Sequence, residues 1–489
     1  MSKTRATQTQ LKMSVVRIIV AATLLVATGL YLKHQPRLSG DYSITVVPPT
    51  CEEHGYSLYT DTSSGATEIR ELVAALGHSF VDEELIQETG EVEPQYLRRI
   101  CRTCGKEEVQ VTYPKTSIAR LSLYGSLDGI GKTSEVPLDA EFVGEGIEFQ
   151  GYTSLKYQGH ESLSYEKKNY TIKFYLDEQH EKKNKLVFNH WRPEHKYILK
   201  ANAIDPSQCR NLVCADVWAD MVKSRGSGTM QLKNLSNYGA VDGFPVALYI
   251  NDEFGGLYTM NLHKDDDLFG MEDGRDQAIM IINRSDKGES LFREEAAFTE
   301  LGAWEVEYCG TSDTTWAKTR INELIHFVCD SNDEAFRRDL SQWLDVDSAI
   351  DYLIAMYALG LEAHGAEDLI LVTYGKNTPW ICSLYDMEDA FSSPGNMAES
   401  LLWERLQDVF FPEICQRYAQ LRQTILSPEM LCARVEAFTA KIPIAFYEAD
   451  AKINHIAMYT TEEAKMLQEQ IWRCVTEADT RFHYAEKVR

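Results

Sequence analysis

The chain lacks an excess of positive charge, and it lacks the cysteine density of a disulfide-stapled secreted domain. It carries 49 lysine and arginine residues against 74 aspartate and glutamate residues, which gives a formal net charge of -25. Because nucleic acids are bound through cations of the protein, this balance argues against a nucleic-acid partner. The 11 cysteines in 489 residues are an odd count, and only Cys101 and Cys104 form a close pair. We expect most of the others to be buried thiols.

Long apolar runs are also scarce, because just one run in the sequence is long enough to cross a bilayer. It covers residues 13–32, in which Arg17 is the only charged residue, and its length matches the hydrocarbon core of a membrane. Three basic residues precede this run and two follow it closely, so the positive-inside bias favours a cytoplasmic N-terminus at 1–12. We therefore predict a transmembrane signal anchor at 13–32, a linker at 33–46, and a single-pass cell-membrane protein whose bulk is extracytoplasmic. A cleaved signal peptide with secretion is the alternative.

A weak repeat of 40 residues runs through residues 47–112. Shifting the chain by 40 residues superimposes one pair of tyrosines and one pair of glycines. The same shift places the Cys101-x-x-Cys104 pair over Asp61 and Ser64, so the two copies differ at the positions that would hold a metal ion.

Neither copy keeps a full set of metal ligands. The first retains Cys51 and His78, whereas the second retains Cys101 and Cys104 but has Glu91 at its leading position. Pooled, the surviving residues make one Cys₃His set, which is a tetrahedral zinc combination. A metal-free remnant, or a disulfide within the Cys-x-x-Cys pair, is the alternative.

The same segment resembles cysteine-rich repeats of bacterial surface proteins. Two stretches carry the resemblance, Pro49-Thr50-Cys51 and Ala75-Leu76-Gly77-His78-Ser79-Phe80. We therefore expect a small zinc-ribbon-like module at 47–112.

From residue 113 to 489, strand-like alternation gives way to helical periodicity, which is typical of an α+β domain. A helix through Ile350–Leu359 is followed by predicted strands at Leu369–Tyr374 and Trp380–Tyr385, and Asp386 comes directly after the second strand. A carboxylate that leaves a strand at this point can face a cleft. Asp386 is therefore the first candidate for a metal ligand.

Five blocks in order resemble the CotH family of spore-coat protein kinases, over about residues 117–485. The resemblance implies a distant protein-kinase-like fold, with a mixed sheet in the N-terminal half and helices in the C-terminal half. It also implies transfer of the γ-phosphoryl group of ATP with Mg²⁺ or Mn²⁺. The blocks are Tyr157-Gln158-Gly159 to Asn169-Tyr170-Thr171, Leu199-Lys200-Ala201-Asn202 with Arg210 and Asn211, Tyr249-Ile250-Asn251 through Tyr258 to Lys264, Asp386-Met387-Glu388-Asp389, and Arg417-Tyr418.

The resemblance also assigns roles to individual residues. Asp386 and Glu388 would bind the Mg²⁺ or Mn²⁺ ion, and Asp368 stands where the family has a metal-binding asparagine. Asp386 is the residue we expect to be indispensable for catalysis. The cations that the resemblance assigns to ATP are Lys168, Lys200, Lys264 and Arg210.

The catalytic loop departs from the family pattern. Ala363 stands at the position of the catalytic aspartate, and a methyl group can neither orient a hydroxyl nor accept its proton. Glu362 and His364 are the neighbours that could compensate. The sequence thus leaves two functions open: a kinase acting on serine or threonine of a surface or coat protein, and a catalytically impaired pseudokinase that serves as a surface or coat assembly module.

Overall fold

The computed structural model describes most of the chain after residue 39, in eight segments that fall into two compact units. The first unit lies within residues 1–88 and 95–112, and the second within residues 89–94 and 113–489. The described segments are 40–85, 90–159, 161–226, 230–282, 292–298, 302–361, 368–393 and 400–484.

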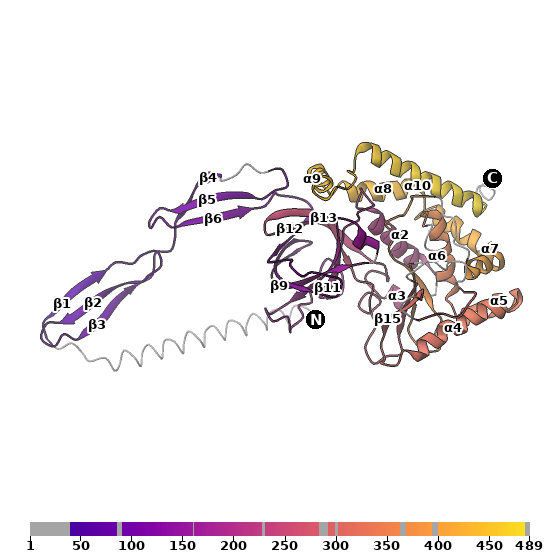
Figure 1. Ribbon diagram of the computed structural model, residues 1–489, viewed down its shortest axis with the longest axis horizontal. Coiled ribbons are helices and arrows are strands. Elements are labelled where there is room, and N and C mark those ends of the chain that lie inside the picture. Colours follow the sequence, from indigo (N-terminus) through magenta and orange to yellow (C-terminus); the bar gives the residue numbers. More distant parts are fainter. Residues whose placement is uncertain are drawn as a thin grey trace. The chain divides into compact units, whose positions relative to one another are not determined.

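The first unit contains two three-stranded antiparallel sheets, ordered β1-β2-β3 and β4-β5-β6 (Figure 1). Each central strand is followed by a tight turn that ends in a glycine with positive φ, 71° at Gly65 and 74° at Gly105, a conformation that costs glycine little. The two sheets are therefore alike in strand order and in turn geometry. The strands are β1 Tyr42–Val47, β2 Gly55–Asp61, β3 Thr67–Val73, β4 Phe80–Leu85, β5 Gln95–Cys101 and β6 Glu107–Thr112.

The second unit begins with a closed barrel of seven strands, ordered β10-β11-β13-β12-β7-β8-β9. Neighbouring strands are antiparallel except for β12 and β7, which run parallel, and β9 pairs with β10 to close the ring. The barrel strands are β7 Ala119–Tyr124, β8 Val136–Gly144, β9 Ile147–Gln158, β10 Asn169–Tyr175, β11 Lys196–Lys200, β12 Gly243–Ile250 and β13 Glu253–Leu262.

A four-stranded antiparallel sheet, ordered β15-β14-β16-β17, follows the barrel and is accompanied by the helices of the second half. Its strands are β14 Ala278–Ile282, β15 Trp304–Cys309, β16 Leu369–Thr373 and β17 Ile381–Leu384. The α-helices are α2 Arg210–Ser224, α3 Met230–Lys233, α4 Thr315–Asp330, α5 Asp333–Asp339, α6 Val346–Ala358, α7 Leu401–Arg422, α8 Pro428–Thr439, α9 Ile444–Asn454 and α10 Thr461–Arg481, and short 3₁₀ turns lie at Glu161–Ser164 and Leu340–Gln342.

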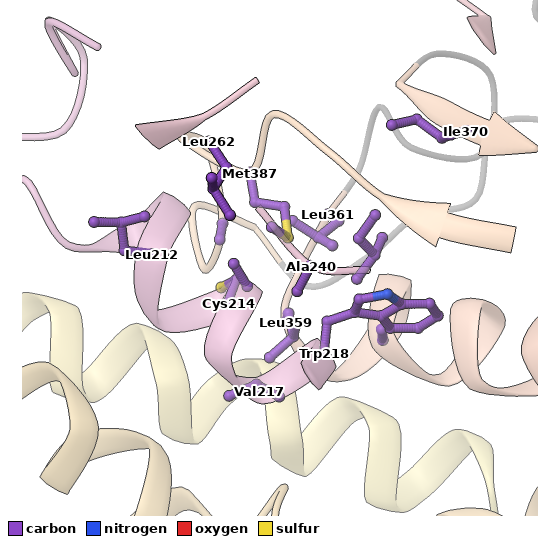
Figure 2. Packing of buried hydrophobic residues seen from close by; sticks show 14 of the residues in the cluster. Leu212, Cys214, Val217, Trp218, Ala240, Leu262, Leu359, Leu361, Ile370 and Met387 are labelled. Atoms are coloured by element: carbon purple, nitrogen blue, oxygen red, sulfur yellow. The ribbon is translucent and has the colours of Figure 1, made fainter. Parts of the chain in front are cut away.

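One hydrophobic core joins the barrel to the helices. Figure 2 shows residues of α2 near Leu262, the last residue of β13, and near Met387, which separates Asp386 from Glu388. Both Leu262 and Met387 are buried, so apolar packing fixes the backbone from which the candidate site residues emerge. The buried cysteines of this unit, as expected from the sequence, are Cys209, Cys214, Cys382, Cys415 and Cys474.

The predicted fold class, a distant protein-kinase-like domain with a mixed sheet, is wrong, because the first half of the second unit closes into a seven-stranded barrel. The sequence pattern marks strands but does not show which strands pair. Closure depends on the parallel pairing of β12 with β7, strands separated by more than a hundred residues, and on the antiparallel pairing of β11 with β13, between which α2, α3 and β12 lie in the sequence. Neither pairing leaves a local signal in the sequence.

The prediction of a membrane anchor also requires correction. No helix among the residues that the structure describes is long and apolar enough to cross a bilayer. The segment 13–32, on which that prediction depended, lies outside the described residues, as does half of the predicted linker at 33–46, residues 33–39. We therefore withdraw the single-pass topology and the cell-membrane location predicted from it.

Candidate nucleotide and metal sites

Strand register brings two of the predicted residues, Asp368 and Asp386, to one end of the four-stranded sheet. Leu369 pairs with Leu384 at the edge of the β16-β17 hairpin, so the next residues outward are Asp368 on one side and Tyr385 on the other. Asp386 follows directly. The predicted helix, strand, turn and strand before Asp386 are confirmed by α6, β16 and β17.

Lys200, the last residue of β11, makes an ion cluster with the carboxylates of Asp386 and Glu388. Its Nζ lies 2.5 Å from Oδ1 of Asp386 and 3.3 Å from Oε2 of Glu388. The lysine side chain is 9% exposed. Burial alone would lower the pKa of Lys200, but the two carboxylates outweigh burial and raise that pKa well above its ordinary value.

The two carboxylates of the cluster do not share the same environment. Burial raises the pKa of Glu388, and the charge of Asp386 adds to this shift while Lys200 opposes it. Asp386 is more exposed, at 27% of its side chain, and has a backbone φ of 56°. A non-glycine residue in this conformation is strained, and such strain persists where the surroundings fix it, often at functional sites.

The loop that carries these carboxylates is held from α2. The side-chain Oδ1 of Asn211 accepts a hydrogen bond from the N–H of Met387 over 2.8 Å. Arg210, beside it, donates to the carbonyl oxygen of Ala390 and to Oε1 of Gln470 on α10. The guanidinium of Arg210 is thus engaged with protein acceptors, which makes it an anchor of the loop.

Lys264, two residues after β13, is a second cation at the same end of the sheet, with its side chain 13% exposed. Its Nζ lies 4.2 Å from the centre of the Tyr385 ring and 3.7 Å from Oε2 of Glu307. Burial lowers the pKa of Lys264, but Tyr385, Glu307 and Asp368 together raise it above its ordinary value. Lys264 and Lys200 both line one pocket, together with Asp386.

The pocket also contains unsatisfied hydrogen-bond acceptors. Its walls include Gln158 at the end of β9 and Asn261 on β13. The side-chain oxygens of both residues are buried and have no hydrogen-bond partner among the described residues. Buried polar groups are usually paired, so these two oxygens are exceptions among the residues that form the pocket wall.

Other predicted residues lie elsewhere or cannot be placed. Nζ of Lys168 donates to the carbonyl oxygens of Leu163 and Tyr165, so this ammonium group is engaged by its own loop. Glu362 and His364 lie outside the described residues.

Sequence reasoning missed the pocket residues Tyr385, Gln158 and Asn261. Tyr385 is predicted from the sequence only as a strand residue. Its position directly before Asp386 is the signal that could have identified it as a pocket residue. Gln158 stood inside a recognised block without an assigned role. Asn261 is a polar residue in a buried strand, a combination that usually requires a partner.

Comparison with protein families matches residues 155–473 to the family described as CotH kinase protein. The chain belongs to the CotH kinase family. The CotH match includes the barrel from the end of β9, the Lys200 cluster, and the helices through most of α10. A kinase-type family implies ATP, a divalent metal ion and a protein substrate. No curated protein sequence matches the chain.

The first unit contains a separate group of residues that could hold a metal ion. One ligand atom from each of Cys51, His78, Cys101 and Cys104 lies within 4.8 Å of the others. Nδ1 of His78 is 3.3 Å from Sγ of Cys104, and Sγ of Cys51 is 3.8 Å from Sγ of Cys101. The structure therefore brings together the four residues that the sequence pooled from two incomplete copies.

The surroundings of this group fit a cation. Backbone N–H groups of Cys104 and Thr103 lower the pKa of Cys101 to about 5, which favours the thiolate. Nε2 of His78 lies 3.1 Å from Oε1 of Glu52, which also accepts from Lys106 over 2.6 Å. A carboxylate on the outer ring nitrogen fixes the tautomer that leaves Nδ1 free to bind a metal ion.

Proposed function

We propose that the chain is an ATP-dependent protein kinase, which transfers the γ-phosphoryl group to a serine or threonine hydroxyl of a protein. The observation that carries the proposal is the cluster of Lys200 with Asp386 and Glu388 beside a pocket that Lys200, Lys264 and Asp386 line. Phosphoryl transfer requires cations on the phosphates and carboxylates on a metal ion, and both kinds of group converge here.

Each residue has a defined part in this proposal. Asp386 and Glu388 offer the carboxylate oxygens that Mg²⁺ or Mn²⁺ prefers, and the bound ion would neutralise charge on the transferring phosphoryl group. Lys200 and Lys264 would bind phosphate oxygens. Asp368, at the same end of the sheet, adds a third carboxylate beside Lys264.

The proposal is tested by incubating the full-length protein with labelled ATP and Mg²⁺ or Mn²⁺ and measuring label on the chain and on added protein. We expect transfer, and we expect Asp386→Asn to reduce its rate by at least about a hundredfold, since the interaction removed acts on the transferring group. The matched control is Asp139→Asn, which changes an exposed aspartate of β8. Absence of both transfer and an ATP-induced thermal shift at millimolar nucleotide would refute the proposal.

The second candidate function is a pseudokinase that serves as a binding or assembly module. The residue that favours it is Ala363, which stands where the family has its catalytic aspartate. Binding of ATP without transfer of label, unchanged when Ala363→Asp alone is introduced, would support this candidate. Transfer that appears only in Ala363→Asp would show that the ancestral chemistry has been lost at this one position.

We also propose that Cys51, His78, Cys101 and Cys104 hold a structural Zn²⁺ ion. A Cys₃His set is complete for tetrahedral zinc, which leaves no open position for a substrate. Elemental analysis of the purified protein should find one zinc per chain, lost in Cys101→Ser and retained in Cys329→Ser, which changes an exposed cysteine elsewhere. Protein that contains no zinc after purification without chelators would refute this assignment.

A further inference from the structure

The turns that follow β2 and β5 have the same backbone hydrogen bonds, although only the second turn carries cysteines. The N–H of Asp61 donates to the carbonyl oxygen of Ala66 over 2.8 Å. In the second turn, the N–H of Cys101 donates to the carbonyl oxygen of Lys106, also over 2.8 Å. In each turn the glycine N–H then donates to the carbonyl oxygen of the last strand residue, over 2.9 Å. The two turns are therefore structural counterparts, with Asp61 in the place of Cys101.

The carboxylate of Asp61 accepts the hydrogen bonds that the first turn donates. Its Oδ1 accepts from the N–H of Ser63 over 2.9 Å, from the N–H of Ser64 over 3.0 Å, and from the Ser63 hydroxyl over 2.6 Å. In the second turn, the N–H groups two and three residues after Cys101 face its sulfur in the same way. Both turns thus present backbone donors to a side-chain acceptor, which is the sulfur of Cys101 in one copy and the carboxylate of Asp61 in the other.

The position that corresponds to the histidine ligand has also changed. Tyr42 pairs with Asp61, and its counterpart in the second copy is Phe80. His78, two residues before Phe80, therefore corresponds to Gly40. A Cβ atom on Gly40 would lie 3.4 Å from Oδ2 of Asp61, so a side chain here would be directed at the first turn. Gly40 has no side chain and therefore offers the first turn no ligand for a metal ion.

We infer that the metal ion is shared between successive copies, and that the first turn is a metal-free version of the same structure. The first copy supplies Cys51, the second supplies the Cys-x-x-Cys turn, and His78 comes from the segment that joins them. That segment is held beside Cys51 by a hydrogen bond of 3.0 Å from the N–H of Gly77 to the Cys51 carbonyl oxygen. The inference rests on the zinc binding proposed above.

The two turns then have different dependences on metal. A zinc ion links the sheet β1-β2-β3 to the sheet β4-β5-β6, because its ligands come from both copies. Among the residues that the structure describes, the carboxylate of Asp61 accepts hydrogen bonds from its own turn alone, so it stabilises that turn and does not link the sheets. Removal of the ion should release the second turn and the connection between the sheets, while the first turn stays ordered.

Hydrogen exchange measured by mass spectrometry on the full-length protein tests this difference. We compare peptides that cover residues 62–65 and 102–105, before and after zinc is removed with a chelator, in the unaltered chain, in Asp61→Ala and in Cys101→Ser. Zinc content is measured on each sample by elemental analysis. Asp61→Asn serves as the matched variant that keeps the shape of the side chain and removes its charge.

We expect chelation to increase exchange at 102–105 at least about tenfold and to leave 62–65 unchanged. Asp61→Ala should increase exchange at 62–65 with or without chelator, and it should retain one zinc per chain. Equal release of both turns by the chelator, loss of zinc in Asp61→Ala, or two zinc ions per chain would overturn the inference. Protein without zinc would instead refute the zinc assignment itself, and that result is separate because the Asp61 effect at 62–65 needs no metal.

Discussion

Replacing Lys200 with methionine should destabilise the second unit in a way that depends on Glu388. The substitution keeps the length of the side chain and removes its charge, so Asp386 and Glu388 are left facing each other without their cation. The lysine side chain is 9% exposed and the two carboxylates are 27% and 20% exposed. Water therefore screens this cluster much less than it screens a surface ion pair.

The magnitude follows from the distances. At 3.3 Å and an effective dielectric constant of about 20, the attraction between Lys200 and Glu388 is of the order of 5 kcal/mol. Desolvation offsets part of this attraction in the intact cluster, but removing one partner leaves buried charge uncompensated, which costs about 3–5 kcal/mol. We expect Lys200→Met to lower the free energy of unfolding by about 3 kcal/mol at pH 7.5.

The loss should be smaller at pH 5. Without Lys200 the pKa of Glu388, already raised by burial in the intact protein, rises further above its unfolded value. The folded state then binds more protons than the unfolded state between these two pKa values, so its stability falls as the pH rises through that interval. Acidification toward pH 5 therefore restores part of what the substitution removes.

Urea denaturation followed by tryptophan fluorescence and circular dichroism measures these differences. The set of variants is Lys200→Met, Glu388→Gln and the double substitution, and the double substitution should recover about 1–3 kcal/mol through coupling. Lys156→Met is the matched control, because Lys156 lies 4.0 Å from Glu135 in a pair with both side chains about a third exposed, and such pairs contribute about 0–1 kcal/mol. The reasoning is refuted if Lys200→Met costs no more than this control, or if Glu388→Gln gives no recovery.

Two further predictions concern other carboxylates. Asp351 accepts from Nε of Arg225 over 2.6 Å and from Nε of Arg417 over 2.8 Å, so Asp351→Ala should lower the free energy of unfolding by about 3–5 kcal/mol, measured by urea denaturation, and a loss below about 1 kcal/mol would contradict it. The pKa of Asp61 is lowered to about 2, chiefly by the Ser63 hydroxyl and the Ser64 N–H, so its stabilisation is complete above the ordinary value of about 3.9 and is lost as the pH falls toward 2. Hydrogen exchange at residues 62–65, corrected for the intrinsic pH dependence of exchange, should increase over this interval in the unaltered chain, and a similar increase in Asp61→Asn would contradict the assignment.

The sequence predicted the local elements around Asp386 and the membership of the metal cluster, because both depend on spacing along the chain. The hairpin before Asp386 consists of two short, mainly apolar runs separated by a turn. The proposed ligands Cys51, His78, Cys101 and Cys104 are recognisable by residue type. The contacts of Lys168 could not be predicted from spacing along the chain. Lys168 lies next to Lys167 in the loop before β10. Lys167 is buried against Asp450, whereas Lys168 turns to carbonyl oxygens of its own loop.

The closure of the barrel and the contents of the pocket depend on contacts between distant segments. Lys200 and Asp386 are separated by 186 residues, and only a family resemblance connected them. Asn261 had no assigned role, because its unsatisfied oxygen becomes visible only when its neighbours in space are known. A single sequence does not contain that information.

Through its contact with Arg210, the C-terminal helix α10 supports the candidate active site. The guanidinium of Arg210 joins the loop after Asp386 to Gln470 on α10, a residue 260 positions further along the chain. A fragment that ends before α10 would keep the carboxylates and lysines proposed to bind metal and nucleotide, yet it would lose an acceptor for the side chain that anchors the loop after Asp386. A fragment made to test kinase activity must therefore include the last helix, because that helix holds the side chain that anchors the loop.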